Sequence, residues 1–420
     1  MRLLLITLLL SWGLALRAHG QTPDLARLSL LEADALLAQK NRELQAARRA
    51  VEAAEAATLS AGQRPNPNLS LTTENINPSR GIGGGTLRDK AVDSTIRLDQ
   101  LIERGNKREL RVSTAKKLEA ASGEDLADVL RQQRLALRAS YYDLLLAQDR
   151  IAISADTAEL FQRTLRAADL RLQAGDIASS DVARIRVDAL RAQNDARAAE
   201  AERRRAQLAL AYMIGAERHA DLIRATDPWP APQAAEGAEP DELIERRPDV
   251  RAARARIEAA GAARELARSL RTRDVSVGVQ FEHFPDNFGN TSNSYGVALS
   301  IPLFTRYHYE GEIAQAESAY NSATDNLERA RAVARSEIAK ALSDVTAAAE
   351  RLARYRDNLL AEAAKSADSA EFAYKNGAIG VMDLLDARRT LRAIQLDAAL
   401  AQSDYAKALA AWQSGFDLLR

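Results

Sequence analysis

The sequence predicts a mainly α-helical fold with a small β-barrel contribution, and three observations predict it. Prolines are absent from residues 86–227 and 303–420, which leaves both stretches free to form long helices because an interior proline breaks a helix. Apolar residues between Leu126 and Leu172 recur at roughly the 3.5-residue spacing of a coiled coil. The second half of the chain also repeats the pattern of the first.

The internal repeat is carried by pairs of matching segments. Leu172-Gln-Ala-Gly175 corresponds to Tyr374-Lys-Asn-Gly377, an offset of 202 residues (377 − 175). The helical segment that begins at Asn41 returns at Arg247. Chance similarity between alanine-rich helices is the alternative, but glycine turns and strands that fall into one register favour a duplication. We therefore expect a duplicated unit of helix, strand, strand, long helix and helix.

Residues 1–20 are predicted to be a secretory signal peptide. A basic residue precedes a fourteen-residue, mostly apolar run from Leu3 to Leu16, and Ala18-His19-Gly20 then supplies a small-x-small cleavage pattern before Gln21. A membrane anchor is the alternative, but this run is shorter than the roughly 20 residues that a spanning helix needs. We therefore expect an exported protein.

Composition and charge exclude several classes of function. Lys plus Arg and Asp plus Glu number 58 each, so no excess of positive charge indicates a nucleic-acid partner. The absence of cysteine excludes disulfides, thiolate metal sites, catalytic thiols and a lipid-modified N-terminal cysteine. The four histidines show no i, i+4 pairing, and no nucleophile, base and acid occur at a recognisable spacing. We expect no enzyme activity, no catalytic residues, no cofactor and no bound metal.

The repeat sets the expected domain boundaries. The first repeat covers residues 21–215 and the second covers 248–420, with a proline-rich linker at 216–247. In the first repeat we expect a helix at 29–62, strands near 67–76 and 92–101, a long helix at 106–174 and a return helix at 177–214. In the second we expect strands near 274–284 and 294–303, a long helix at 309–376 and a return helix at 378–415.

The four predicted strands have the length and pattern of membrane-crossing strands. Apolar and polar residues alternate most clearly from Val275 to Glu282, and each strand has about ten residues, as a tilted bilayer-spanning strand does. Four strands cannot close a barrel, and an open edge in lipid would leave backbone groups unpaired. A trimer would supply a twelve-stranded outer-membrane barrel (3 × 4), and its helices, about 100 Å long, would form a periplasmic α-helical barrel.

Three motifs show a resemblance to a known family. They are the glycine turns Leu172-Gln-Ala-Gly-Asp-Ile-Ala-Ser-Ser-Asp-Val and Tyr374-Lys-Asn-Gly-Ala-Ile-Gly-Val-Met-Asp-Leu-Leu-Asp-Ala, and Leu101-Ile-Glu-Arg-Gly-Asn-Lys-Arg after the second strand. With the duplicated order of elements they resemble the TolC outer-membrane factor family. The third motif resembles its heavy-metal branch, of the cobalt-zinc-cadmium resistance type. The resemblance covers essentially the whole mature chain.

The resemblance implies a homotrimeric exit duct of a tripartite efflux system. Such a duct lies in outer-membrane lipid and docks with a periplasmic adaptor and an inner-membrane transporter of the resistance-nodulation-division type. The heavy-metal branch implies export of divalent cations such as cobalt, zinc, cadmium or nickel. An outer-membrane factor for drugs, other small molecules or type I secretion is the alternative. A periplasmic adaptor or a coiled-coil structural protein fits less well, because neither explains a duplicated pattern of strand pairs.

The resemblance also implies roles for residues at the periplasmic tip. Asp383 and Asp386 stand where the family has two aspartates that constrict the closed pore, and three copies would give a cation-attracting ring of carboxylates. Helix capping is the alternative for Asp383, because it directly follows a turn. Gly175 and Gly377 are expected to serve the turn conformation first and adaptor docking second.

A latch of the closed state is the second implied element of the tip. Tyr374 and Asp181, with Ser180 beside it, match a tyrosine and an aspartate that hold the closed state together in the family. Helix capping or solvation is the alternative for Asp181. Ile379 stands where the type member of the family has an arginine, so this part of the lock departs from the family pattern.

Overall fold

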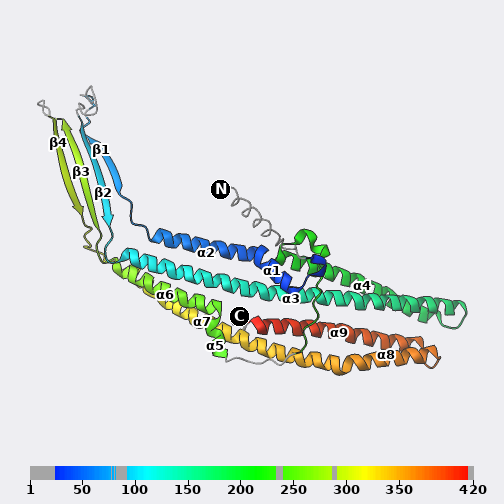
Figure 1. The fold of residues 1–420 in the computed structure, drawn as a ribbon. Coiled ribbons are helices and arrows are strands. Elements are labelled where there is room, and N and C mark those ends of the chain that lie inside the picture. Colours follow the sequence, from blue (N-terminus) through cyan, green and yellow to red (C-terminus); the bar gives the residue numbers. More distant parts are fainter. Residues whose placement is uncertain are drawn as a thin grey trace, which may run out of the picture. The chain divides into compact units, whose positions relative to one another are not determined.

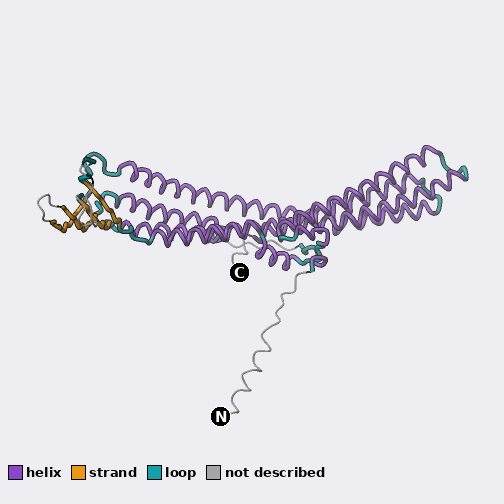
Figure 2. Tube along the Cα trace, turned by 90° about the horizontal axis from the view of Figure 1, so that it is seen from above, coloured by secondary structure: helices purple, strands orange, loops and turns teal. Residues whose placement is uncertain are grey.

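The computed structural model describes residues 24–76, 78–79, 81, 92–232, 240–285 and 291–414. These residues are mostly helical and include one four-stranded sheet (Figure 1, Figure 2). The predicted signal peptide at 1–20 and the glycine run at 83–85 lie outside the described residues.

The described chain divides into two units, and both halves of the sequence contribute to each. The sheet unit takes the described residues between 44 and 129 and between 240 and 339. The helical unit takes residues 24–43, 130–232 and 340–414. Helices α3 (Lys107–Gln173) and α7 (Glu310–Arg354) contribute residues to both. The two sequence repeats therefore do not fold as two separate units.

The sheet consists of four antiparallel strands in the order β1, β2, β3, β4. They are β1 (Asn68–Glu74), β2 (Asp93–Ile102), β3 (Val275–Pro285) and β4 (Thr291–Ser300), and Figure 1 shows them side by side. The central pairing joins β2 and β3, which come from different repeats, with Ile96 opposite Phe281. β4 ends before Pro302, which has no N–H to donate to a strand ladder, and so falls short of the predicted end at 303.

The sheet unit also contains α2 (Arg42–Ala61), α5 (Pro240–Arg246), α6 (Pro248–Ser269) and the first parts of α3 and α7. Arg247, whose side chain is only 4% exposed, lies 2.8 Å from the carboxylates of both Asp249 and Glu337 and so ties α6 to α7. Ion pairs tie α6 to α3, namely Lys117–Glu258, Arg251–Glu124 and Arg256–Asp125.

The helical unit contains α1 (Leu30–Lys40), α4 (Ser179–Ile214), α8 (Leu360–Lys375), α9 (Val381–Ser414) and the remaining parts of α3 and α7. Tyr141 of α3 is fully buried, and its hydroxyl donates to the Leu28 carbonyl at 2.9 Å. The same hydroxyl accepts hydrogen bonds from the Thr226 and Asp227 amides, both at 3.1 Å. Burial raises the pKa of Tyr141 to about 12. Tyr141 therefore holds two chain segments against α3.

The segment expected to be a linker, 216–247, contains regular structure. It includes the short 3-10 helix Glu217–Leu222 as well as α5. Trp229 stacks on Tyr142 of α3 with ring centroids 5.9 Å apart, and its Nε1 donates to Asp149 at 2.8 Å. The prolines limit helix length here, but the aromatic contact fixes part of the segment on the helical unit.

Two predicted helices are interrupted. The helix expected at 29–62 is divided at Asn41, a buried residue whose side-chain amide donates to the Met213 carbonyl at 3.2 Å. The helix expected at 309–376 includes a π-helical turn, Tyr355–Leu359, between α7 and α8. Helical periodicity is a local pattern, so it predicts neither interruption.

Candidate functional site

Two glycine turns join α3 to α4 and α8 to α9 in the helical unit. Gly175 and Gly377 have left-handed backbone conformations, with φ of +83° and +72°. Glycine adopts this conformation without the steric cost of a Cβ atom. In each turn the amide after the glycine donates to the carbonyl five residues earlier, at 2.9 Å and 2.8 Å, as in a Schellman cap. Both glycines therefore have the turn conformation that the sequence predicts. We call these turns and the first turns of α4 and α9 the tip.

Tyr374 contacts Arg171 across the tip. Its hydroxyl accepts a hydrogen bond from Arg171 Nη1 at 2.9 Å, and the guanidinium carbon lies 5.2 Å from the centroid of its ring. Asp181 lines the same pocket as Tyr374, and Ser180 is exposed beside it. Among the described residues, the Tyr374 hydroxyl is bonded to Arg171 and not to Asp181. In the structure Tyr374 is therefore bonded to an arginine, and its latch with Asp181 stays a prediction.

Asp383 and Asp386 are exposed residues in the first turns of α9. The Asp383 carboxylate accepts a hydrogen bond from the Gly380 amide at 3.2 Å and so caps the helix. Asp386 lies one turn further along and has no hydrogen bond or ion pair with any described residue. Ile379, which replaces the family arginine, is partly buried and lines the tip pocket. Asp383 thus has the capping contact, while the Asp386 carboxylate faces solvent.

Two ion pairs between α4 and α9 were missed by the sequence analysis. Arg389 pairs with Asp188, whose side chain is 10% exposed, and Arg392 Nη2 lies 2.7 Å from Asp195 Oδ2. Asp188 and Asp195 are seven residues apart, a spacing that places both side chains on one face of α4. Their partners lie about 200 positions away, however, and only the folded structure sets the register between the two hairpins.

An apolar cluster packs α3, α4 and α9 together next to the tip. Leu385 of α9 is buried in this cluster. Its neighbour Asp386 points to another side of the helix and is exposed. The other buried members are Phe161, Ala168, Val182, Ile185, Ala189 and Ala192.

The sheet has an apolar face and a polar face. Strand register aligns alternate residues in rows across all four strands, and residues of one row point to one face. Two adjacent rows on one face are Leu71, Ile96, Phe281, Tyr295 and Leu69, Leu98, Val279, Val297. Tyr295 and Val297 are 84% and 83% exposed. A continuous exposed apolar face of this kind indicates contact with lipid or with another protein.

The opposite face of the sheet carries polar and small residues. Arg97 and Asp99 form an ion pair at 2.8 Å beside Gly278. A Cβ atom at Gly278 would lie 2.2 Å from Asp99 Oδ1, so glycine leaves the room that this pair occupies. Gly296 leaves room for Gln280 in the same way, because a Cβ there would lie 2.9 Å from Gln280. The sheet is therefore amphipathic.

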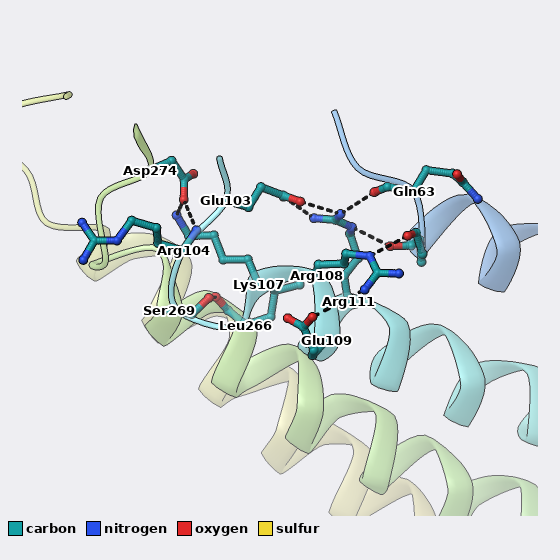
Figure 3. Close-up of polar contacts among 12 residues, drawn as sticks. Gln63, Glu103, Arg104, Lys107, Arg108, Glu109, Arg111, Leu266, Ser269 and Asp274 are labelled. Carbon is teal, nitrogen blue, oxygen red and sulfur yellow. Dashed lines mark hydrogen bonds and ion pairs between the residues drawn. The ribbon is translucent and has the colours of Figure 1, made fainter. Parts of the chain in front are cut away.

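A polar cluster joins the sheet to its helices at one end of the strands (Figure 3). Lys107 of α3, whose side chain is 8% exposed, donates to Asp274 Oδ1 at 2.7 Å and to the Thr272 carbonyl at 2.8 Å. Arg111 binds Glu103 through both terminal nitrogens, at 2.6 Å and 3.1 Å. The hydrogen bond from Arg111 lowers the pKa of Glu103. These contacts attach the ends of β2 and β3 to α3.

The described part of the chain lacks two features. It holds no group of three or more histidine, aspartate or glutamate side chains placed to bind a metal ion. It also holds no helix with the length and apolarity of a membrane span. His308 is exposed, and His283 Nδ1 lies 2.8 Å from Asn293 Oδ1 between β3 and β4.

A family model and a known relative each match most of the chain in sequence. A family model described as outer membrane efflux protein matches residues 35–216 and 240–413. The cobalt-zinc-cadmium resistance protein CzcC of Cupriavidus metallidurans is 26% identical over 367 residues, which cover 87% of this chain and 84% of CzcC.

Solved structures show the same fold. The outer-membrane channel OprN superposes with a TM-score of 0.77 at 22% identity, covering 92% of this chain and 89% of OprN. CusC, whose structures concern folding and transmembrane channel formation, superposes with a TM-score of 0.72 at 17% identity, covering 92% of this chain and 91% of CusC.

Proposed function

Since this chain belongs to the outer membrane efflux protein family, we propose that it is the exit channel of a tripartite efflux system that exports divalent metal cations. Its family and its fold are those of transport ducts in the outer membrane that are not enzymes. The amphipathic sheet is the main observation that supports the proposal, because its apolar face is exposed in the single chain.

The edges of the sheet support a trimer. Among the described strands, β1 and β4 each pair with one neighbour only. In lipid, an edge of unpaired N–H and C=O groups costs several kcal/mol per group. Three copies would pair β4 of one chain with β1 of the next and close a barrel of twelve strands (3 × 4). Val297 and its row would then face lipid, and the Arg97–Asp99 pair would face the lumen.

The tip supports a cation as substrate. Asp383 and Asp386 from three copies would place six carboxylates (3 × 2) around a narrow axis, which attracts cations and disfavours anions. The relative CzcC is by its name a cobalt-zinc-cadmium resistance protein. The proposed substrates are accordingly cobalt, zinc, cadmium or nickel ions.

The closed state of the tip is proposed to depend on contacts between the two hairpins. Arg171 with Tyr374 and Arg389 with Asp188 each join the α3–α4 hairpin to the α8–α9 hairpin. Separation of the hairpins would break both contacts, so they favour the closed state. In this proposal they take over the role of the Tyr374–Asp181 latch.

The turns are proposed to receive a periplasmic adaptor. A Cβ atom on Gly175 or Gly377 would meet no atom within 4 Å, so both turns present an open surface. Backbone groups at such a surface suit docking to another helical hairpin. The adaptor would connect the channel to an inner-membrane transporter of the resistance-nodulation-division type, which would select the metal.

Growth of a strain that lacks this chain tests the substrate. On graded zinc, cobalt, cadmium, nickel and copper salts, we expect reduced tolerance of at least one metal and restoration by the native chain. Tolerance of organic antibiotics and dyes serves as the control and should not change. Unchanged metal tolerance together with lost tolerance of organic compounds would instead assign the channel to small-molecule efflux.

A further inference from the structure

We infer that the end of the sheet that meets the helices binds the phosphate groups of anionic phospholipids through an arginine belt. The belt consists of Arg64, Arg104, Arg271, Arg273 and Arg306. This inference rests on the proposed function, because it requires the sheet to lie in a bilayer.

Strand order brings the five arginines to the same end of the sheet. In an antiparallel sheet of this order, the start of β1, the end of β2, the start of β3 and the end of β4 lie at the same end. Arg64 precedes β1 and Arg104 follows β2. Arg271 and Arg273 precede β3, and Arg306 follows β4. Each strand therefore has an arginine beside this end.

The belt arginines form few contacts within the protein: Arg271 donates to the His308 carbonyl at 3.4 Å, and its charge contributes to lowering the pKa of Glu310. All five arginines are exposed, and none forms an ion pair with a described residue. Arg104 is an example, because its backbone amide donates to Asp274 at 2.9 Å while its guanidinium points away from the cluster (Figure 3). Three nearby carboxylates pair with cationic side chains outside the belt, namely Glu103–Arg111, Asp274–Lys107 and Glu109–Arg108. Glu312 accepts a hydrogen bond from the Tyr307 hydroxyl, and Glu310 lies beside His308.

Apolar and aromatic side chains accompany the belt. Leu303, just after β4, is 72% exposed. Phe304 and Tyr309 have ring centroids 5.2 Å apart, and Tyr307 lies 6.0 Å from Tyr309. The Arg273 guanidinium lies 5.4 Å from the Phe304 centroid. Aromatic rings beside basic residues at one level are typical of a membrane–water interface.

Phosphate is the group that this belt fits best. A guanidinium donates paired hydrogen bonds to phosphate oxygens, and it keeps its charge at any physiological pH. The exposed apolar face of the sheet begins beside the belt, where lipid chains would cover it. A phospholipid satisfies both features with one molecule, since its headgroup binds arginine and its chains cover apolar strands. We therefore assign the belt to phospholipid headgroups rather than to free phosphate.

Lipid selectivity of the purified protein in proteoliposomes tests the belt. The measurement is the association constant of spin-labelled phosphatidylglycerol relative to spin-labelled phosphatidylcholine. We expect a ratio of about five for the native protein, the factor that one basic residue near an anionic headgroup supplies. The ratio should fall to about one at 1 M salt, where the Debye length is about 3 Å. It should fall equally in a variant with all five belt arginines changed to glutamine.

A matched variant controls for the loss of charge. It changes five exposed arginines of the helical unit to glutamine, and these likewise form no ion pair with a described residue. They are Arg166, Arg184, Arg191, Arg197 and Arg204. This variant should keep the native ratio. Added inorganic phosphate at constant ionic strength should leave the ratio unchanged, and displacement of the labelled lipid by phosphate would overturn the assignment. If native protein inserted in the bilayer gave a ratio of one, the proposed binding of phospholipid by the belt would be wrong, whereas the proposed channel function would be unaffected. Failure of native protein to insert would overturn both.

Discussion

Arg389 of α9 forms an ion pair with Asp188 of α4, whose carboxylate is almost fully buried. A buried charge is costly without a partner, so this pair couples the position of α9 to that of α4. Arg392 and Asp195 repeat the contact further along the same two helices at 2.7 Å. The two hairpins of the helical unit are therefore joined by charges on their facing sides.

The variant R389A is expected to increase the single-channel conductance in planar bilayers, because the hairpins lose a contact that favours the closed tip. D188N should have the same effect, and the double variant should add little to either single change because both remove one interaction. R191A changes an exposed arginine of α4 without an ion pair in the described chain and should leave conductance as it is. Native conductance in R389A would show that the pair is not part of the lock.

D386N is expected to weaken block of the pore by divalent cations. A Coulomb contribution of about 1 kcal/mol corresponds to about a fivefold loss of blocking affinity. D383N should act similarly without disturbing the helix start, since the amide oxygen of asparagine can still accept from the Gly380 amide. D325N, an exposed change on α7, is the control and should show native block. Native block in both tip variants would assign the two aspartates to capping and solvation.

Replacing Gly175 and Gly377 with alanine together is expected to reduce adaptor binding and metal tolerance. Each alanine would have to adopt a left-handed backbone conformation, at a free-energy cost of about 1 kcal/mol. We expect this strain to alter the turn and to leave the trimer unchanged. Pull-down of the adaptor and the oligomeric mass measure the two effects separately. G81A makes the same change at a glycine with φ of +65° outside the tip and should retain adaptor binding. Full binding by the tip variant would place docking elsewhere.

G278A is expected to lower the temperature at which the trimer dissociates in detergent. Its Cβ atom would lie 2.2 Å from Asp99 Oδ1, so the Arg97–Asp99 pair would have to move. G123A in α3 is the matched control, because no atom lies within 4 Å of a Cβ there and alanine favours a helix by about 1 kcal/mol. Gel mobility after stepwise heating measures the difference. Equal dissociation temperatures for G278A and native protein would contradict this account of the polar face.

Acid is expected to weaken the attachment of the sheet to α3. Arg111 lowers the pKa of Glu103 below its ordinary value of 4.5, so the pair stabilises the folded state above that pH. The stabilisation is lost as pH falls through the folded-state pKa. The melting temperature should therefore fall more steeply below pH 4.5 in native protein than in E103Q. E55Q, an exposed change on α2, should keep the native dependence of melting temperature on pH. The same dependence in E103Q would show that Glu103 does not cause the loss of stability in acid.

Sequence reasoning predicted the features that strong local signals determine. The positive φ at Gly175 and Gly377 follows from a glycine placed just after a long helical pattern. The alternating strands beside long helices predict the fold that the solved channels share. The family resemblance rests on the same turns and is confirmed by the family model.

The contacts that sequence reasoning missed depend on register between distant segments. The hydrogen bond between Arg171 and Tyr374 is one such contact, because nothing in the sequence sets how the α8–α9 hairpin lies against α3. The Asp188–Arg389 pair was missed for the same reason. The break at Asn41 depends on a buried amide that bonds to a residue more than 170 positions away.

The mass of the purified protein in detergent shows whether this chain forms an outer-membrane channel only as an assembly, and it is measured by light scattering corrected for bound detergent. We expect three chains per particle, since the edges of β1 and β4 need partners from other copies. A particle with a single chain would contradict this expectation, because four strands cannot enclose a pore.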